Sequence, residues 1–227
     1  MPTFAELLSQ LSFLASTPSM AGALVAAAVI VVVVDWRASI FALACVVVFA
    51  GLLYSRVLPP QVAGVKLIVG LLICVQLFVT ARQIHGTDRA PTPADEPQTG
   101  STDQPPAPRF AIPTGLPFRI IAALMVVVVS WQVSTTPEFA LTAVPSDVTV
   151  TAFGLVGLGL LGLGLTEEPL KAGMFLITMI TGFEMYYAAV EPALAVIALL
   201  AVMDFAIALG ACYLAVIRAL PDRSAAK

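Results

Sequence analysis

Long runs of apolar residues, separated by short polar interruptions, fill most of this chain. A helix needs about 20 apolar residues to cross a bilayer, and on that basis the pattern predicts seven membrane-spanning helices. Their expected ranges are 19–36, 38–57, 60–82, 117–134, 149–165, 169–190 and 193–217. Only the short stretch 35–37 interrupts the apolar run of the first two ranges, which predicts either a tight helical hairpin or one long bent helix. We therefore expect an all-α integral membrane protein.

The composition agrees with this fold class and excludes several functions. Hydrophobic residues make up 59% of the chain, charged residues 11%, and the mean hydropathy is +0.99, which is too apolar for a soluble domain. There is no basic tract, so nothing indicates a nucleic-acid partner, and the lipid bilayer is the expected surroundings. The single histidine, His85, lies between apolar segments, and the three cysteines lie in three different segments without metal-like spacing. We therefore expect no cofactor, no metal and no catalytic residue.

The basic residues predict how the chain is oriented in the membrane. With the N-terminus outside and the C-terminus in the cytoplasm, nine basic residues fall on the cytoplasmic side and only Arg56 and Lys66 fall outside. This distribution fits an odd number of crossings. Within residues 1–18, a short amphipathic pattern predicts a segment that lies along the membrane interface. Its apolar positions are Leu7, Leu8, Leu11, Phe13 and Leu14.

A proline-rich connection divides the chain into two membrane parts. The connection spans residues 83–116, contains seven prolines and few apolar residues, and is predicted to be a disordered cytoplasmic linker. It separates a three-helix part with the amphipathic start, residues 1–82, from a four-helix part, residues 117–227. No convincing sequence repeat relates the two parts.

The fifth predicted helix is rich in glycine. Small residues let neighbouring helices approach closely, so the glycines predict close packing wherever they share a face. On a helix they fall on two faces: Gly154, Gly157 and Gly164 on one, and Gly159 and Gly162 on the other. We therefore expect this helix to be packed on two sides, within a larger assembly.

Two carboxylates, Glu184 and Asp204, lie inside the last two apolar segments and far from their ends. A charge in hydrocarbon costs about 2.5–3.5 kcal/mol on insertion scales, so such residues usually handle protons, ions or a polar partner. The alternative is that they only bond neighbouring helices. Thr181 and Tyr187 lie three residues either side of Glu184 on the same helical face, which makes them supporting candidates.

Lys66 is a further candidate for a proton path. It lies about six residues inside the third span, near its outer end. The favoured interpretation is that its side chain snorkels to the interface, and the alternative is that it pairs with an intramembrane acid.

The hairpin of the last two helices predicts the spacing of the two carboxyls. With the turn at 190–192, Glu184 lies about 10 Å and Asp204 about 18 Å below it. We therefore expect the two groups to be too far apart for a direct bond and suited to a water-bridged proton relay.

Residues 153–217 resemble the small K-type membrane subunit of respiratory complex I, and are similar to the related subunits of hydrogenase-4 and of Mrp-type cation antiporters. The resemblance rests on the glycine-rich helix, the polar turn Thr166–Lys171, the motif Gly182-Phe183-Glu184-Met185 and Asp204 in an alanine-rich run. The chain's length looks more like the E-type subunit of hydrogenase-4 than like a K-type chain.

The resemblance implies a role that the residues alone do not establish. It implies a membrane subunit of a complex I-like or hydrogenase-4-like oxidoreductase in a prokaryotic cytoplasmic membrane, beside larger antiporter-like subunits. In it, Glu184 and Asp204 would contribute to proton translocation, and the redox chemistry would reside in other subunits. Two alternatives remain open: a component of an Mrp-type cation/proton antiporter, and a structural scaffold subunit of a membrane complex.

Overall fold

The computed structural model describes residues 17–33, 35–87, 115–136, 144–190 and 193–219, and every regular element within them is an α-helix. The all-α prediction is therefore confirmed. In chain order the helices are α2 (Thr17–Val32), α3 (Trp36–Tyr54), α4 (Pro60–Thr87), α5 (Gly115–Ser134), α6 (Ser146–Leu165), α7 (Pro169–Val190) and α8 (Leu194–Ala219).

Six of these seven helices are long and apolar enough to cross a membrane, which makes the chain a multi-pass membrane protein. The first predicted span, 19–36, corresponds to the shorter helix α2, which has 16 residues. At 1.5 Å per residue it is about 24 Å long, less than the roughly 30 Å of a hydrocarbon core. Helix α2 ends before the polar residues 35–37 because Asp35 begins the next helix.

Between α2 and α3 the chain makes a tight hairpin, one of the two arrangements that the sequence allowed. The two helices pack against each other. The Asp35 carboxylate accepts a hydrogen bond from the backbone N–H of Arg37 at 3.1 Å, which satisfies one of the free donors at the start of α3.

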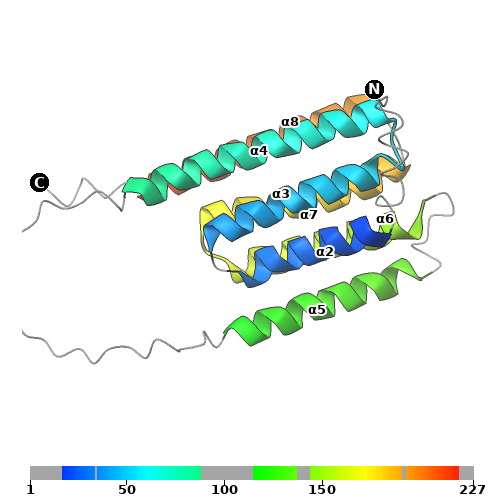
Figure 1. The fold of residues 1–227 in the computed structure, drawn as a ribbon, viewed down its shortest axis with the longest axis horizontal. Coiled ribbons are helices and arrows are strands. Elements are labelled where there is room, and N and C mark those ends of the chain that lie inside the picture. Colours follow the sequence, from blue (N-terminus) through cyan, green and yellow to red (C-terminus); the bar gives the residue numbers. More distant parts are fainter. Residues whose placement is uncertain (1–16, 34, 88–114, 137–143, 191–192, 220–227) are drawn as a thin grey trace, which may run out of the picture.

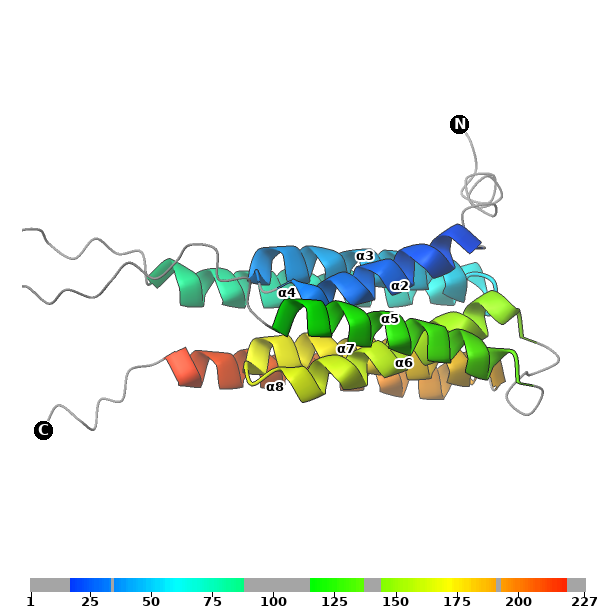
Figure 2. The same cartoon turned by 90° about the horizontal axis from the view of Figure 1, so that it is seen from below.

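The helices form two layers that lie one over the other in the view of Figure 1 and side by side in that of Figure 2. The first layer holds α2, α3 and α4, and the second holds α6, α7 and α8 in the same order. Contacts across the layers join α2 to α6, α3 to α7 and α4 to α8, and α5 closes the edge beside α2 and α6. The first layer comes from helices before the linker and the second from helices after it, and the division of the chain into two membrane parts stays a prediction.

Successive helices run in alternate directions, so the connections gather at two ends (Figure 1). We call the end with the α3–α4 and α7–α8 connections the outer end, following the predicted orientation, and the opposite end the inner end. Arg119, Lys171 and Arg218 lie near helix ends at the inner end, and which end faces the cytoplasm stays a prediction.

The boundaries of the linker differ from the prediction. Helix α4 continues to Thr87, five residues beyond the predicted span, and α5 begins at Gly115. Helicity persists there because residues 83–87 contain no proline. Residues 1–16, the linker interior at 88–114 and the turn residues 191–192 lie outside the described residues, so the predicted amphipathic start and disordered linker stay predictions.

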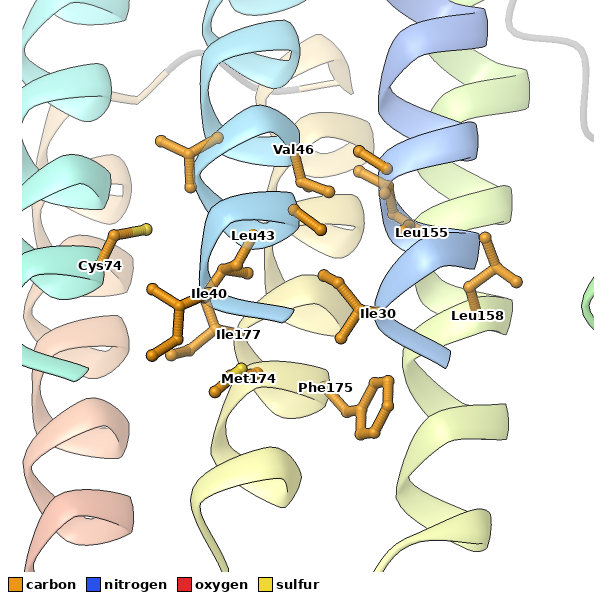
Figure 3. Packing of buried hydrophobic residues seen from close by; sticks show 14 of the residues in the cluster. Ile30, Ile40, Leu43, Val46, Cys74, Leu155, Leu158, Met174, Phe175 and Ile177 are labelled. Atoms are coloured by element: carbon orange, nitrogen blue, oxygen red, sulfur yellow. The ribbon is translucent and has the colours of Figure 1, made fainter. Parts of the chain in front are cut away.

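The apolar core lies between the two layers, where α2, α3, α6 and α7 meet. Ile30, Leu43, Leu155 and Met174 are among its most buried side chains (Figure 3). Helices α4, α5 and α8 are the most exposed, and their outward faces carry large apolar side chains. Such faces suit contact with lipid or with other membrane helices.

Glycines bring α6 close to its neighbours on two sides, which confirms the sequence prediction. A Cβ at Gly154 or Gly157 would meet Leu24 of α2 or Val126 of α5. On the other face, a Cβ at Gly159 would lie 2.8 Å from the backbone of α7.

Candidate functional site

A cluster of three charged side chains lies inside the bundle, where the two layers meet. The ammonium of Lys66, on α4, forms an ion pair with Glu184 Oε2 on α7 and lies 3.3 Å from Asp204 Oδ2 on α8. Glu184 is 3% exposed and Asp204 6%. The structure thus brings together both carboxylates that the sequence singled out and the lysine that it offered as a supporting candidate.

Lys66 does not snorkel to the interface, so the favoured interpretation of this residue is wrong and the alternative holds. Its side chain is only 9% exposed and turns into the bundle. The reason is that α4 packs against α8, so an acid lies within reach of the flexible lysine stem. A single sequence gives no indication of which helices will be neighbours.

The two carboxyls are also closer than predicted, since both contact the same nitrogen atom. Glu184 lies six residues before the end of α7 and Asp204 ten residues after the start of α8, an axial offset of about 6 Å. Side chains on a helix lean toward its N-terminus. Because α7 and α8 are antiparallel, Glu184 leans inward and Asp204 leans outward, and the leaning closes the offset.

Tyr54 is a fourth member of the cluster, and the sequence analysis missed it. It is the last residue of α3 and is buried. Its hydroxyl lies 3.1 Å from the Thr181 carbonyl oxygen and 3.4 Å from Glu184 Oε2, and can donate to either acceptor. A tyrosine at the end of an apolar run is typical of the membrane interface. The sequence context of Tyr54 therefore gives no indication that its side chain is buried beside Glu184.

The two supporting candidates on α7 differ in their outcome. Thr181 lies at the site, but its hydroxyl donates to the Ile177 carbonyl oxygen at 2.8 Å, so only its backbone oxygen meets Tyr54. Tyr187 is half-buried and its ring stacks on Phe183, with ring centroids 6.2 Å apart. The hydrogen bonds of the Glu184 carboxylate join it to Tyr54 and Lys66.

Apolar layers close the cluster toward both ends of the bundle. On the outer side lies a compact group of buried residues from the outer ends of the helices, including Leu53, Val148 and Met185. On the inner side the larger core begins with Val47, Ile73 and other apolar side chains. In this conformation the three charges are therefore separated from water along the bundle axis.

The cluster contains one more acid than base. If both carboxyls are ionised, Lys66 balances only one of them, and an uncompensated charge in an apolar interior is costly. Uptake of one proton would bring the three groups to neutrality. The arrangement is therefore chemically suited to binding and releasing a single proton.

Other charged contacts lie at the helix ends. Arg56 pairs with Asp147 at 3.3 Å at the outer end, and both side chains are partly exposed, so this pair contributes little to stability. At the inner end the Arg119 guanidinium donates to the backbone oxygens of Val31 and Leu165, which satisfies carbonyls at the C-terminal ends of α2 and α6. These contacts support the bundle and lie away from the buried cluster.

Comparison with known proteins identifies no relative. No protein-family model matches the chain, and neither the curated proteins nor the solved structures contain a significant match. Within the described residues, no group of three His, Cys, Asp or Glu side chains is placed to hold a metal ion. Conclusions about function therefore rest on the buried cluster and on the sequence resemblance.

Proposed function

We propose that this chain is a membrane subunit of a complex I-like or hydrogenase-4-like oxidoreductase of a prokaryotic cytoplasmic membrane, and that Glu184 and Asp204 contribute to its proton translocation. The observation that carries the proposal is the buried cluster of two carboxyls and one ammonium inside a membrane bundle. Ionisable groups at such depth are expensive, and proton relays are among the functions that maintain them.

The cluster suggests how the proton is handled. When one carboxyl takes up a proton, the Lys66 ammonium is drawn toward the other, which remains ionised. Release of the proton draws the ammonium back, so the lysine moves in response to which acid is charged. Because a lysine side chain has four rotatable carbon–carbon bonds, this movement needs no displacement of the helices.

The proposal places the redox chemistry in other subunits. The exposed apolar faces of α4, α5 and α8 leave room for the larger antiporter-like subunits that the resemblance implies. The cluster lies directly behind the α4–α8 pair, since Lys66 and Asp204 belong to those two helices. A partner that covers this pair would be separated from the cluster by one helix layer.

The test is Glu184→Gln in the intact membrane complex. The amide keeps the size of the side chain and cannot take up a proton, so the ratio of protons pumped to electrons transferred should fall while the complex still assembles. The matched control is Glu168→Gln, at a side chain that is 66% exposed, and it should leave the ratio unchanged. Normal pumping by an assembled Glu184→Gln complex would refute the proposal.

A scaffold function is the second candidate, and one observation favours it. The ion pairs of Lys66 join helices from the two layers, so they hold together the two parts of the chain. If this is their whole purpose, Glu184→Gln will reduce assembly or stability and leave pumping per assembled complex intact. An Mrp-type antiporter component would instead show transport that depends on Na⁺ without redox partners.

A further inference from the structure

A groove lies between α5 and α6, at the edge of the bundle and away from the buried cluster. Its volume is about 470 Å³, which is within the range of ligand-binding sites in proteins. Six residues of α5, from Ala122 to Val133, and four of α6, from Phe153 to Leu161, line it. The groove therefore follows the two helices along the bundle.

The groove forms because the two helices meet at small residues. A Cβ at Gly157 would lie 2.7 Å from the side chain of Val126, so α5 and α6 approach each other closely there. The lining residues Met125 and Val129 are 67% and 50% exposed, and α5 buries only three of its side chains. One side of the groove is therefore open to the surroundings of the bundle, where the bilayer lies.

The lining of the groove suits a hydrocarbon chain. Its only polar side chain is Ser130, whose hydroxyl already donates to the Val126 carbonyl oxygen at 2.8 Å. A polar ligand or a stretch of extended peptide would lose its hydrogen bonds to water and gain none here. A partner helix is about 10–12 Å across with its side chains, so it would cover the groove without filling it.

The length of the groove matches the depth of one lipid leaflet. At 1.5 Å per residue, the stretch of α5 from Ala122 to Val133 is about 16 Å long. The hydrocarbon core of a bilayer is roughly 30 Å thick, so each leaflet contributes about 15 Å. An acyl chain that enters from the inner end would lie within the groove over most of that depth.

Arg119 lies at the inner end of the groove, one turn before Ala122 on α5. Its guanidinium donates to the carbonyl oxygens of Val31 and Leu165, at 3.4 and 3.3 Å, and so lies level with the ends of α2 and α6. A guanidinium has five N–H donors, and these two contacts leave three. Within the described residues, no carboxylate forms an ion pair with Arg119.

The space beside Arg119 is open. Gly164 lies one turn from Leu161 toward the inner end of α6, and a Cβ there would meet no atom within 4 Å. The inner end of the groove thus combines an arginine without an acidic partner and room for a polar group. This combination is complementary to the phosphate of a lipid head group.

We propose that the groove binds one acyl chain of an anionic phospholipid, with the lipid phosphate against Arg119. The acyl chain gains little by leaving the bilayer, because lipid tails are as apolar as the groove. The head group therefore determines which lipid binds, and basic residues between membrane helices favour anionic head groups. This site does not involve the buried cluster and does not depend on the proposed function.

The first test is native mass spectrometry of the full chain in mixed micelles. The micelles contain equal amounts of phosphatidylglycerol and phosphatidylcholine with the same acyl chains. We expect one retained phosphatidylglycerol per chain, preferred about fivefold, which corresponds to the attraction of one basic residue near the membrane surface. Equal retention of the two lipids, or retention of neither, would overturn the proposal.

Two pairs of variants locate the retained lipid. Ala122→Leu fills the groove and should lower retention, whereas Ala206→Leu, on the exposed surface of α8, should not. Arg119→Met should remove the preference for phosphatidylglycerol. Arg218→Met, at an arginine of the same end that contacts the Glu167 carbonyl oxygen, should keep that preference. Equal effects of site and control variants would show that the lipid binds elsewhere and would overturn the proposal.

Photolabelling of the unaltered protein supplies an independent test that does not require any variant to fold. The probe is phosphatidylglycerol with a photoreactive diazirine in one acyl chain, added to the full chain purified with the subunits that it retains. We expect the label on peptides that contain Met125 and Phe153. Label spread evenly over α4, α5 and α8 would indicate bulk lipid only and would overturn the proposal. So would protection of the groove by a retained subunit, because the occupant would then be a protein.

Discussion

Replacing Lys66 with methionine tests the buried cluster most directly. Methionine keeps an unbranched apolar stem of similar length and removes only the ammonium. Glu184 and Asp204 then face each other without a cation, although both are more than nine-tenths buried. Removing one partner of a buried ion pair costs about 3–5 kcal/mol, whereas an exposed pair contributes about 0–1 kcal/mol. We expect Lys66→Met to lower the free energy of unfolding by about 3–5 kcal/mol at neutral pH.

The assay is reversible unfolding in lipid–detergent micelles, followed by circular dichroism. The double variant Lys66→Met/Glu184→Gln should have a higher free energy of unfolding than Lys66→Met alone, because one of the two uncompensated carboxylates is removed. The deficit of Lys66→Met should also shrink as the pH falls, because a protonated carboxyl carries no charge to be balanced. The matched control is Arg56→Met, which breaks a partly exposed pair and should change stability by about 1 kcal/mol or less.

One outcome would refute this reasoning. If Lys66→Met costs less than about 1 kcal/mol, is equally destabilising at every pH and shows no coupling to Glu184→Gln, the ammonium behaves as an exposed group. Lys66 would then reach water by snorkelling, and the three groups would not form a buried cluster.

Three further predictions use the same unfolding assay. Gly182→Ala should destabilise the protein by about 1–3 kcal/mol, because the new Cβ would lie 2.6 Å from a backbone oxygen of α6. The control Gly210→Ala places a Cβ where no atom lies within 4 Å, so it should be neutral or stabilising by up to about 1 kcal/mol. Tyr54→Phe should cost about 0.5–3 kcal/mol through the lost hydroxyl, and Tyr213→Phe, at a side chain that is 67% exposed, should change nothing measurable. Arg119→Met should cost about 1.5–3 kcal/mol and speed amide hydrogen exchange at the inner end, since it frees carbonyls at two helix ends.

Part of the candidate site could be predicted from the sequence because it depends on local context. Glu184 and Asp204 stand out since each interrupts a long apolar run, and the cost of a charge in hydrocarbon does not depend on which helix lies beside it. The two-sided packing of α6 could be predicted for the same reason, because the spacing of glycines along one helix determines which faces are small.

The rest of the site could not be predicted because it depends on contacts between distant segments. Lys66 and Glu184 are 118 residues apart in the chain, and Tyr54 and Glu184 are 130 apart. Near the outer end of a span, a lysine or a tyrosine has an ordinary interfacial role. The buried role appears only when a particular neighbour is placed opposite it.

The sequence by itself determined that the chain is helical, that it resides in a membrane, where most of its helices begin and end, and which two acids are exceptional. These properties follow from the length of the apolar runs, because the thickness of the bilayer and the rise per residue of a helix fix how many apolar residues a span needs. Only the tertiary structure decided that α4 lies against α8, that Lys66 turns inward, and that two acids one or two turns apart reach the same nitrogen atom. The physical reason is that helix pairing is a property of whole surfaces, whereas a sequence pattern describes one helix at a time.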